Sequence, residues 1–235
     1  MIKPTIDTDE MLKNLAAEAA KQAENVRGAV RDMTLNALRG RELSLAQIRQ
    51  VLKSVTEGVS MGAAKPGIDA EKVLQDSVAG MDEALLKAVE ANRIALEQLA
   101  SQGQTFCESQ VKKALSDLEK LEADFLQTVK QAAEQGDQTL LAPWASGLQQ
   151  NQTSGTQTGA QVAATMAQFS EQMQSAIRGQ RRAALEAAQV FSENFTTLAS
   201  GILIGLSEGL QQRAGDSGRK TNNRGDPCGP GRNRK

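Results

Sequence analysis

Side chains that could act as nucleophiles or metal ligands are scarce in this chain. Its 235 residues include no histidine and two cysteines, Cys107 and Cys228. Without histidine, Ser-His-Asp and Cys-His nucleophilic sites, the Glu-x-x-His sites of di-iron bundles and His-ligated zinc sites are excluded. Two isolated cysteines make neither a disulfide framework nor a metal-ligand spacing. We therefore expect no catalytic residue, no metal site and no bound cofactor.

The remaining reactive groups are carboxylates, lysines and the thiol of Cys107. From Glu108 to Glu122 the acidic residues alternate with lysines, and such a run on a helix is usually a solvated face with i,i+4 ion pairs. Cys107 lies between Phe106 and Glu108 and lacks a cationic neighbour that would activate it, so we interpret it as a small buried apolar group. The sequence thus predicts a protein that is not an enzyme.

Three glycines near the C-terminus form a pattern that favours contact between helices. Gly201, Gly205 and Gly209 recur every four residues in an apolar segment. This small-xxx-small spacing allows two helix backbones to approach closely. Because the segment is too short to span a bilayer, we expect close helix packing or self-association there, and insertion into a lipid or polymer surface is the alternative.

The elements that would position such contacts are long amphipathic helices. The most regular apolar pattern starts at residue 162, with steps of three and four over about six heptads, as in supercoiled or bundled helices. We predict that this pattern is an interaction stripe. Its residues are Val162, Met166, Phe169, Met173, Ile177, Phe191, Phe195, Leu198, Ile202 and Leu206.

Two earlier apolar stripes predict an N-terminal helical pair over residues 1–65. The first stripe runs from Met11 to Ala37 in steps of three and four. The second begins at Leu45, directly after Ser44, which has Gln47 three positions on in the manner of a capping box. Glycine and proline between residues 62 and 67 end this second helix.

A long-helix bundle is predicted for residues 66–212. Its first stripe runs from Val73 to Val129, which is longer than globular helices usually are, so the helix is either broken near Gly103 or a rod that needs a coiled partner. A Gly/Gln/Thr-rich loop is expected at 136–159, with Trp144 as a hydrophobic anchor rather than a ligand-stacking surface.

The fold class predicted from these patterns is all-α, with long amphipathic helices in an extended bundle or coiled coil. The last segment, 213–235, carries a net charge of +5 and too little apolar content to order itself, so we expect a disordered basic tail. The preceding residues carry a net charge of −6, which argues against specific nucleic-acid binding. The sequence shows neither an export signal nor a transmembrane run, and we expect a cytoplasmic protein.

Long Ala- and Gln-rich helices, the lack of histidine chemistry and a terminal apolar helix with glycines resemble the phasins and phasin-like proteins of bacteria, and uncharacterised bacterial families of long helices. The resemblance covers Met11 to Leu210. It implies an oligomeric structural protein that coats polyhydroxyalkanoate granules. The contact would be made by the stripe from Val162 to Leu206.

Two functions follow as hypotheses. The first is a homo-oligomeric helical interaction protein that binds a hydrophobic surface such as a storage granule. The second is a cytoplasmic coiled-coil adaptor or regulator whose helices recognise a protein partner. Both rest on burial of apolar side chains, each of which contributes about 1.5 to 3 kcal/mol when it is removed from water.

Overall fold

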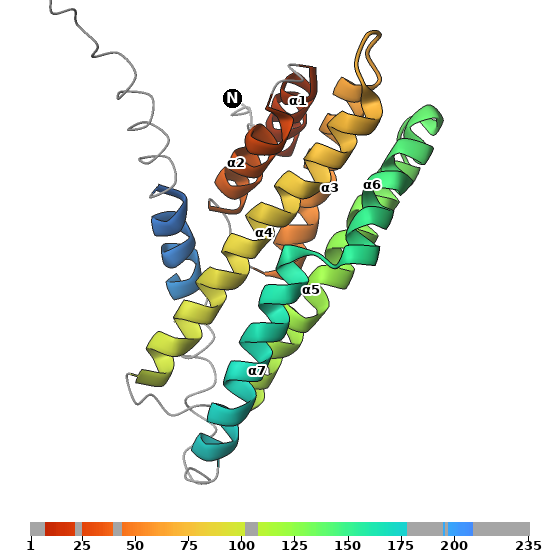
Figure 1. Ribbon diagram of the computed structural model, residues 1–235. Coiled ribbons are helices and arrows are strands. Elements are labelled where there is room, and N and C mark those ends of the chain that lie inside the picture. The colour runs from red at the N-terminus through yellow and green to blue at the C-terminus, as the bar shows by residue number, and fades with distance from the viewer. Residues whose placement is uncertain are drawn as a thin grey trace, which may run out of the picture.

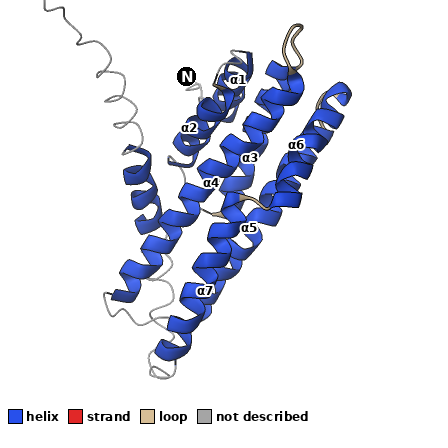
Figure 2. Cartoon of the chain, in the orientation of Figure 1, coloured by secondary structure: helices blue, strands red, loops and turns tan. Residues whose placement is uncertain are grey.

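The described part of the chain is helical throughout. The computed structural model describes residues 8–21, 25–39, 44–101, 108–177, 195 and 197–208. No strand occurs among these residues, so the predicted all-α class is confirmed (Figure 1, Figure 2). The elements are α1 (Thr8–Lys21), α2 (Val26–Arg39), α3 (Leu45–Ala63), α4 (Ala70–Ser101), α5 (Glu108–Glu134), the short 3-10 helix η1 (Gln138–Leu140), α6 (Leu141–Ser154), α7 (Gln157–Ile177) and a further helical segment, 197–208.

Helices α4 and α5 form the frame of the bundle. They run in opposite directions along its length, and α3, α6 and α7 each pack against both of them (Figure 1). Helices α6 and α7 follow one another along one side of this frame. The stripe predicted from Val73 to Val129 is therefore two helices rather than one rod, and Gly103 lies outside the described residues.

The N-terminal hairpin, formed by α1 and α2, packs on α3 and α4. Helix α1 lies on α3, and α2 lies on α4. Gly58 and Gly62 allow the first contact, because a Cβ at either position would collide with the backbone of α1, and Gly80 has the same role beneath α2. The described residues before residue 66 thus form three helices, where the sequence predicted a pair.

Asn25 explains why the first predicted stripe is two helices. Its side-chain oxygen accepts the backbone N–H of Gly28 at 3.2 Å, and its carbonyl accepts the N–H of Ala29 at 3.0 Å. Both bonds are typical of a helix N-cap. The same arrangement begins α3, where Ser44 accepts the N–H of Gln47 at 3.4 Å, as the sequence predicted.

The predicted loop at 136–159 is mostly helix, and this expectation was wrong. Leu140, Trp144 and Leu148 are spaced four residues apart and all three are buried. Their common face lets α6 pack on α4 and α5 although most of its other residues are polar or small. Pro143 lies in the first turn of α6, where a proline is tolerated because its missing N–H would have no helical partner.

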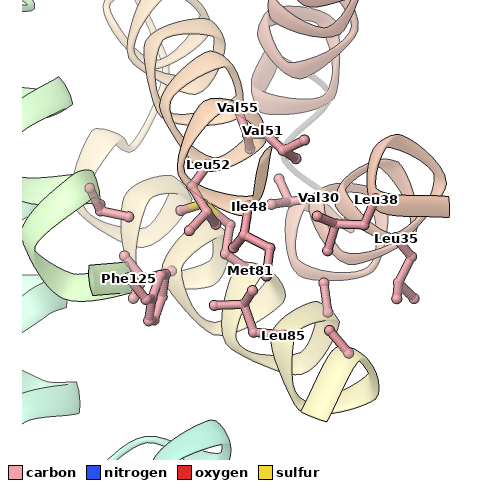
Figure 3. Packing of buried hydrophobic residues seen from close by; sticks show 14 of the residues in the cluster. Val30, Leu35, Leu38, Ile48, Val51, Leu52, Val55, Met81, Leu85 and Phe125 are labelled. Atoms are coloured by element: carbon pink, nitrogen blue, oxygen red, sulfur yellow. The ribbon is translucent and has the colours of Figure 1, made fainter. Parts of the chain in front are cut away.

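One buried apolar cluster joins all of these helices. Figure 3 shows part of it, where Val30 of α2, Leu52 of α3, Met81 of α4 and Phe125 of α5 point toward a common interior. The same cluster extends from Leu12 in α1 to segment 197–208. Helices α1 to α3 therefore pack as part of the bundle rather than as a separate unit, and the predicted tail, 213–235, lies outside the described residues.

Candidate interaction surface

The first half of the predicted interaction stripe lies inside the bundle. Val162 and Phe169 are buried on the face of α7 that packs on α4 and α5, and Met166 is half-buried against the same core. The side chains of Met173 and Ile177, and all of Phe191, lie outside the described part of the chain.

The second half of the stripe belongs to segment 197–208 and the residue just before it. Phe195, Leu198, Ile202 and Leu206 are half-buried and pack against the core. The fully buried face of segment 197–208 is offset by one residue from the predicted stripe. Its large buried side chain is Leu203 rather than Ile202. The sequence analysis missed that side chain, although Leu203 lies next to Ile202 and is equally apolar.

The predicted close-packing glycines do not meet another helix in the described part of the chain. Gly201 and Gly205 are exposed, and a Cβ added at either would have no heavy atom within 4 Å. Gly209 lies outside the described residues. Within the bundle, close approach of helices occurs instead at Gly80 and at Gly58 and Gly62, which form a Gly-x-x-x-Gly pair on α3.

A groove between α1 and α2 presents an exposed apolar surface. Met11 is 54% exposed and Leu15 is 58% exposed, and both lie on its α1 side. The groove has a volume of about 610 Å³. We call it the α1–α2 groove, and its lining is Thr8, Met11, Leu12, Leu15, Ala19, Ala29, Met33, Asn36 and Ala37.

The α1–α2 groove exists because α1 has two apolar faces. Its inner face is built from Leu12, Ala16 and Ala20, which are buried and pack toward α3. Its outer face begins one residue earlier, with Met11 and Leu15 as its largest members, and no described helix covers it. Isolated apolar residues on a surface are normal, but a contiguous group in a groove marks an interaction site.

Ion pairs fix the two helices that border the groove. Lys13 of α1 is paired with Glu57 of α3 at 2.6 Å, and Arg31 of α2 is paired with Asp32 at 2.8 Å and with Glu83 of α4 at 3.5 Å. The hydrogen bond that Arg31 donates to Asp32, together with the attraction of the Asp32 and Glu83 carboxylates, outweighs partial burial and raises the pKa of Arg31 above its ordinary value. The groove lining itself contains no charged side chain. Its chemistry is therefore that of an uncharged apolar contact.

A smaller hollow of about 480 Å³ lies between α5 and α6, with Lys130, Glu134 and Trp144 in its wall. The indole N–H of Trp144 is already donated to Ser60, so the side chain serves as the predicted anchor.

Within the described residues, no group of three or more Cys, Asp or Glu side chains could hold a metal ion. Within the same residues, no helix is both long and apolar enough to cross a membrane.

Comparison with known proteins gives one match. No curated protein and no solved structure matches the chain. A family model described as a family of unknown function, DUF6781, matches residues 1–212, a range that includes α1 to α7 and segment 197–208. The chain therefore belongs to DUF6781, a family of unknown function.

Proposed function

We propose that the protein is a non-enzymatic interaction protein that binds the apolar face of a partner helix in the α1–α2 groove. The observation that carries this proposal is the exposure of Met11 and Leu15 in an uncharged groove, while the other faces of the two helices are occupied by α3 and α4. An adaptor or regulator in the cytoplasm needs such a permanent, preformed surface.

The dimensions of the groove suit a helix. The lining runs from Thr8 to Ala19 on α1 and from Ala29 to Ala37 on α2, so the groove is about 14 to 18 Å long and could take about three turns of a partner helix. Helices that bind in this way use apolar anchors at positions i, i+3, i+4 and i+7. Met11 and Met33 line opposite sides of the groove, and the flexible methionine side chain adapts its shape to such anchors.

A granule coat is the second candidate, and it follows from the resemblance to phasins. Val162 and Phe169, which would make that contact, are inside the folded bundle. A coat formed by the closed bundle would have to use Met11 and Leu15 instead. A second copy of the chain could also cover them, as the expected homo-oligomer would require.

The test uses a double variant, Met11→Lys with Leu15→Lys, and the control Met61→Lys. Met61 is a comparably exposed methionine on α3 and is not part of the groove lining. Wild type and variants are mixed separately with a fluorescent amphipathic helical peptide and with polyhydroxyalkanoate particles, and each is sedimented alone. We expect tight peptide binding by wild type and by Met61→Lys, and a loss of more than tenfold in the double variant.

Other results of the same experiment would point to a different occupant of the α1–α2 groove. If the double variant loses attachment to particles and peptide binding is unaffected, the coat becomes the better function. If it loses self-association instead, a second copy occupies the groove. Equal peptide binding by all three proteins would rule out the groove as the binding surface.

A further inference from the structure

The junction between α6 and α7 is a short break in an otherwise continuous run of helix. Gly155 ends α6 with φ of 77°, a left-handed conformation that favours glycine, and Thr156 follows it. Helix α7 then begins at Gln157. The first turn of a helix has backbone N–H groups without helical acceptors, so a buried break of this kind needs acceptors from elsewhere.

Two carboxylates from different helices supply these acceptors. Asp82 of α4 accepts the N–H of Gln157 at 2.8 Å through Oδ2 and the N–H of Thr158 at 3.0 Å through Oδ1. Glu122 of α5 accepts the N–H and the hydroxyl of Thr156 at 3.2 and 2.5 Å through Oε1. The hydroxyl of Thr158 also donates to the backbone carbonyl of Asp82 at 3.0 Å. These hydrogen bonds, which we call the clamp, hold the α6–α7 junction to both α4 and α5.

The clamp is cooperative because Asp82, Thr156 and Thr158 are buried together. Asp82 is 2% exposed, and a buried carboxylate is stable only while donors or charges compensate for its lost hydration. Those donors include the N–H groups of Gln157 and Thr158, at the positive end of the α7 dipole. Partial release would leave the carboxylate and the amides unpaired. We therefore expect the junction to be either clamped or fully open.

The described side chains of α7, 157–169, make a small apolar attachment beyond the clamp. Among its described side chains the buried ones are Thr158, Val162, Thr165 and Phe169, two of which are polar. A stretch of α3 of the same length, 45–57, buries four large aliphatic side chains, which are Ile48, Val51, Leu52 and Val55. Segments with few buried apolar contacts open locally at lower free energy than the rest of a fold.

We infer that Asp82 and Glu122 form a latch, and that Gly155 and Thr156 are the hinge at which α7 leaves the bundle while α1 to α4 stay folded. Opening exposes Val162, Met166 and Phe169. An apolar surface that captures these side chains stabilises the open state by binding it selectively. This device is independent of the α1–α2 groove, which lies on other helices.

The test is hydrogen exchange of the full chain, measured by mass spectrometry, for wild type, Asp82→Asn and Asp76→Asn. An asparagine at position 82 keeps one acceptor and turns an NH2 group toward the other backbone N–H. Asp76 is a half-buried aspartate on the same helix and serves as the matched control. In Asp82→Asn we expect exchange of amides 157–169 to rise about tenfold to a hundredfold, as loss of hydrogen bonds to a charged acceptor predicts. Amides of α1 to α3 should exchange as in wild type.

A second variant, Glu122→Gln, weakens the acceptor of the Thr156 N–H and hydroxyl without touching Asp82 or the Thr156 hydroxyl, which accepts the N–H of Gly159 at 2.8 Å. It should raise exchange in the same amides. Protection of 157–169 at the wild-type level in both variants would overturn the latch. An equal rise of amide exchange in every helix would also overturn the latch, because α7 would then open only when the whole bundle unfolds. Asp76→Asn should match wild type, and a selective rise in 157–169 in this control would also overturn the specific role of Asp82.

Discussion

Trp144 of α6 donates its indole N–H to the hydroxyl of Ser60 on α3, with 3.1 Å between Nε1 and Oγ, and both side chains are buried. The Ser60 hydroxyl in turn donates to the carbonyl of Thr56 at 2.8 Å. This short chain of hydrogen bonds connects α3 and α6 through two residues that lie 84 positions apart in the sequence. It lets the largest buried side chain of the protein keep its polar atom satisfied.

Ser60→Ala should destabilise the protein by about 1 to 3 kcal/mol, because it leaves the buried indole N–H without an acceptor. Denaturant unfolding measures this change in the free energy of unfolding. In the Trp144→Phe background, which has no indole N–H, the same substitution should cost clearly less. Equal costs in the two backgrounds would mean that the hydrogen bond contributes nothing to stability.

Gly62→Ala should destabilise the protein by about 1 to 3 kcal/mol or more, because the added methyl group would collide with the backbone of α1 at Ala17. Gly205→Ala is the matched control. Its methyl group meets no atom within 4 Å, and alanine favours helix over glycine by about 1 kcal/mol. Thermal unfolding should therefore show a lower Tm for the first variant and a higher one for the second.

The Gly205 variant also tests the predicted role of the C-terminal glycines in self-association. A helix of a second copy that packs closely on Gly201 and Gly205 would be displaced by the methyl group. Sedimentation at several concentrations would then show weaker association of Gly205→Ala together with its raised Tm. Unchanged association would rule out a close contact between copies at this position.

Asp137 should titrate below the ordinary range of an aspartate. Its carboxylate accepts the N–H of Thr139 at 2.9 Å and its hydroxyl at 2.8 Å, and these bonds lower the pKa of Asp137. The resulting stability is present above the ordinary pKa of an unfolded aspartate and is lost as the pH falls through the lowered value in the folded state. A carboxyl NMR titration would show the lowered midpoint, and Thr139→Ala should move it back toward the ordinary value.

Much of the fold could be predicted from apolar spacing alone. The all-α class and the helix that begins after Ser44 were expected from the sequence and are present. The helix around Trp144 was missed because residues 136–159 are rich in glycine, glutamine and threonine, a composition that indicates a loop. Asn25 was missed as a helix start because the apolar stripe continues across it.

The candidate site could not be located from spacing, for a physical reason that α1 illustrates. Leu12 and Met11 begin two parallel apolar faces with the same spacing of four. The face with the smaller residues, Ala16 and Ala20, is buried because Gly62 and the other small residues of α3 admit it at close range. Which face of α1 is buried therefore depends on the surface of α3 and cannot be read from the sequence of α1 alone.

The central claim is that the α1–α2 groove binds an apolar helix face, and methionine methyl NMR tests it most directly. The protein is labelled at its methionine methyl groups and titrated with an amphipathic peptide of about three helical turns. The resonances of Met11 and Met33, which line the groove, should shift, while those of the exposed Met61 and the buried Met81 should stay in place. Shifts at Met61 or Met166, without shifts at Met11 and Met33, would contradict the claim.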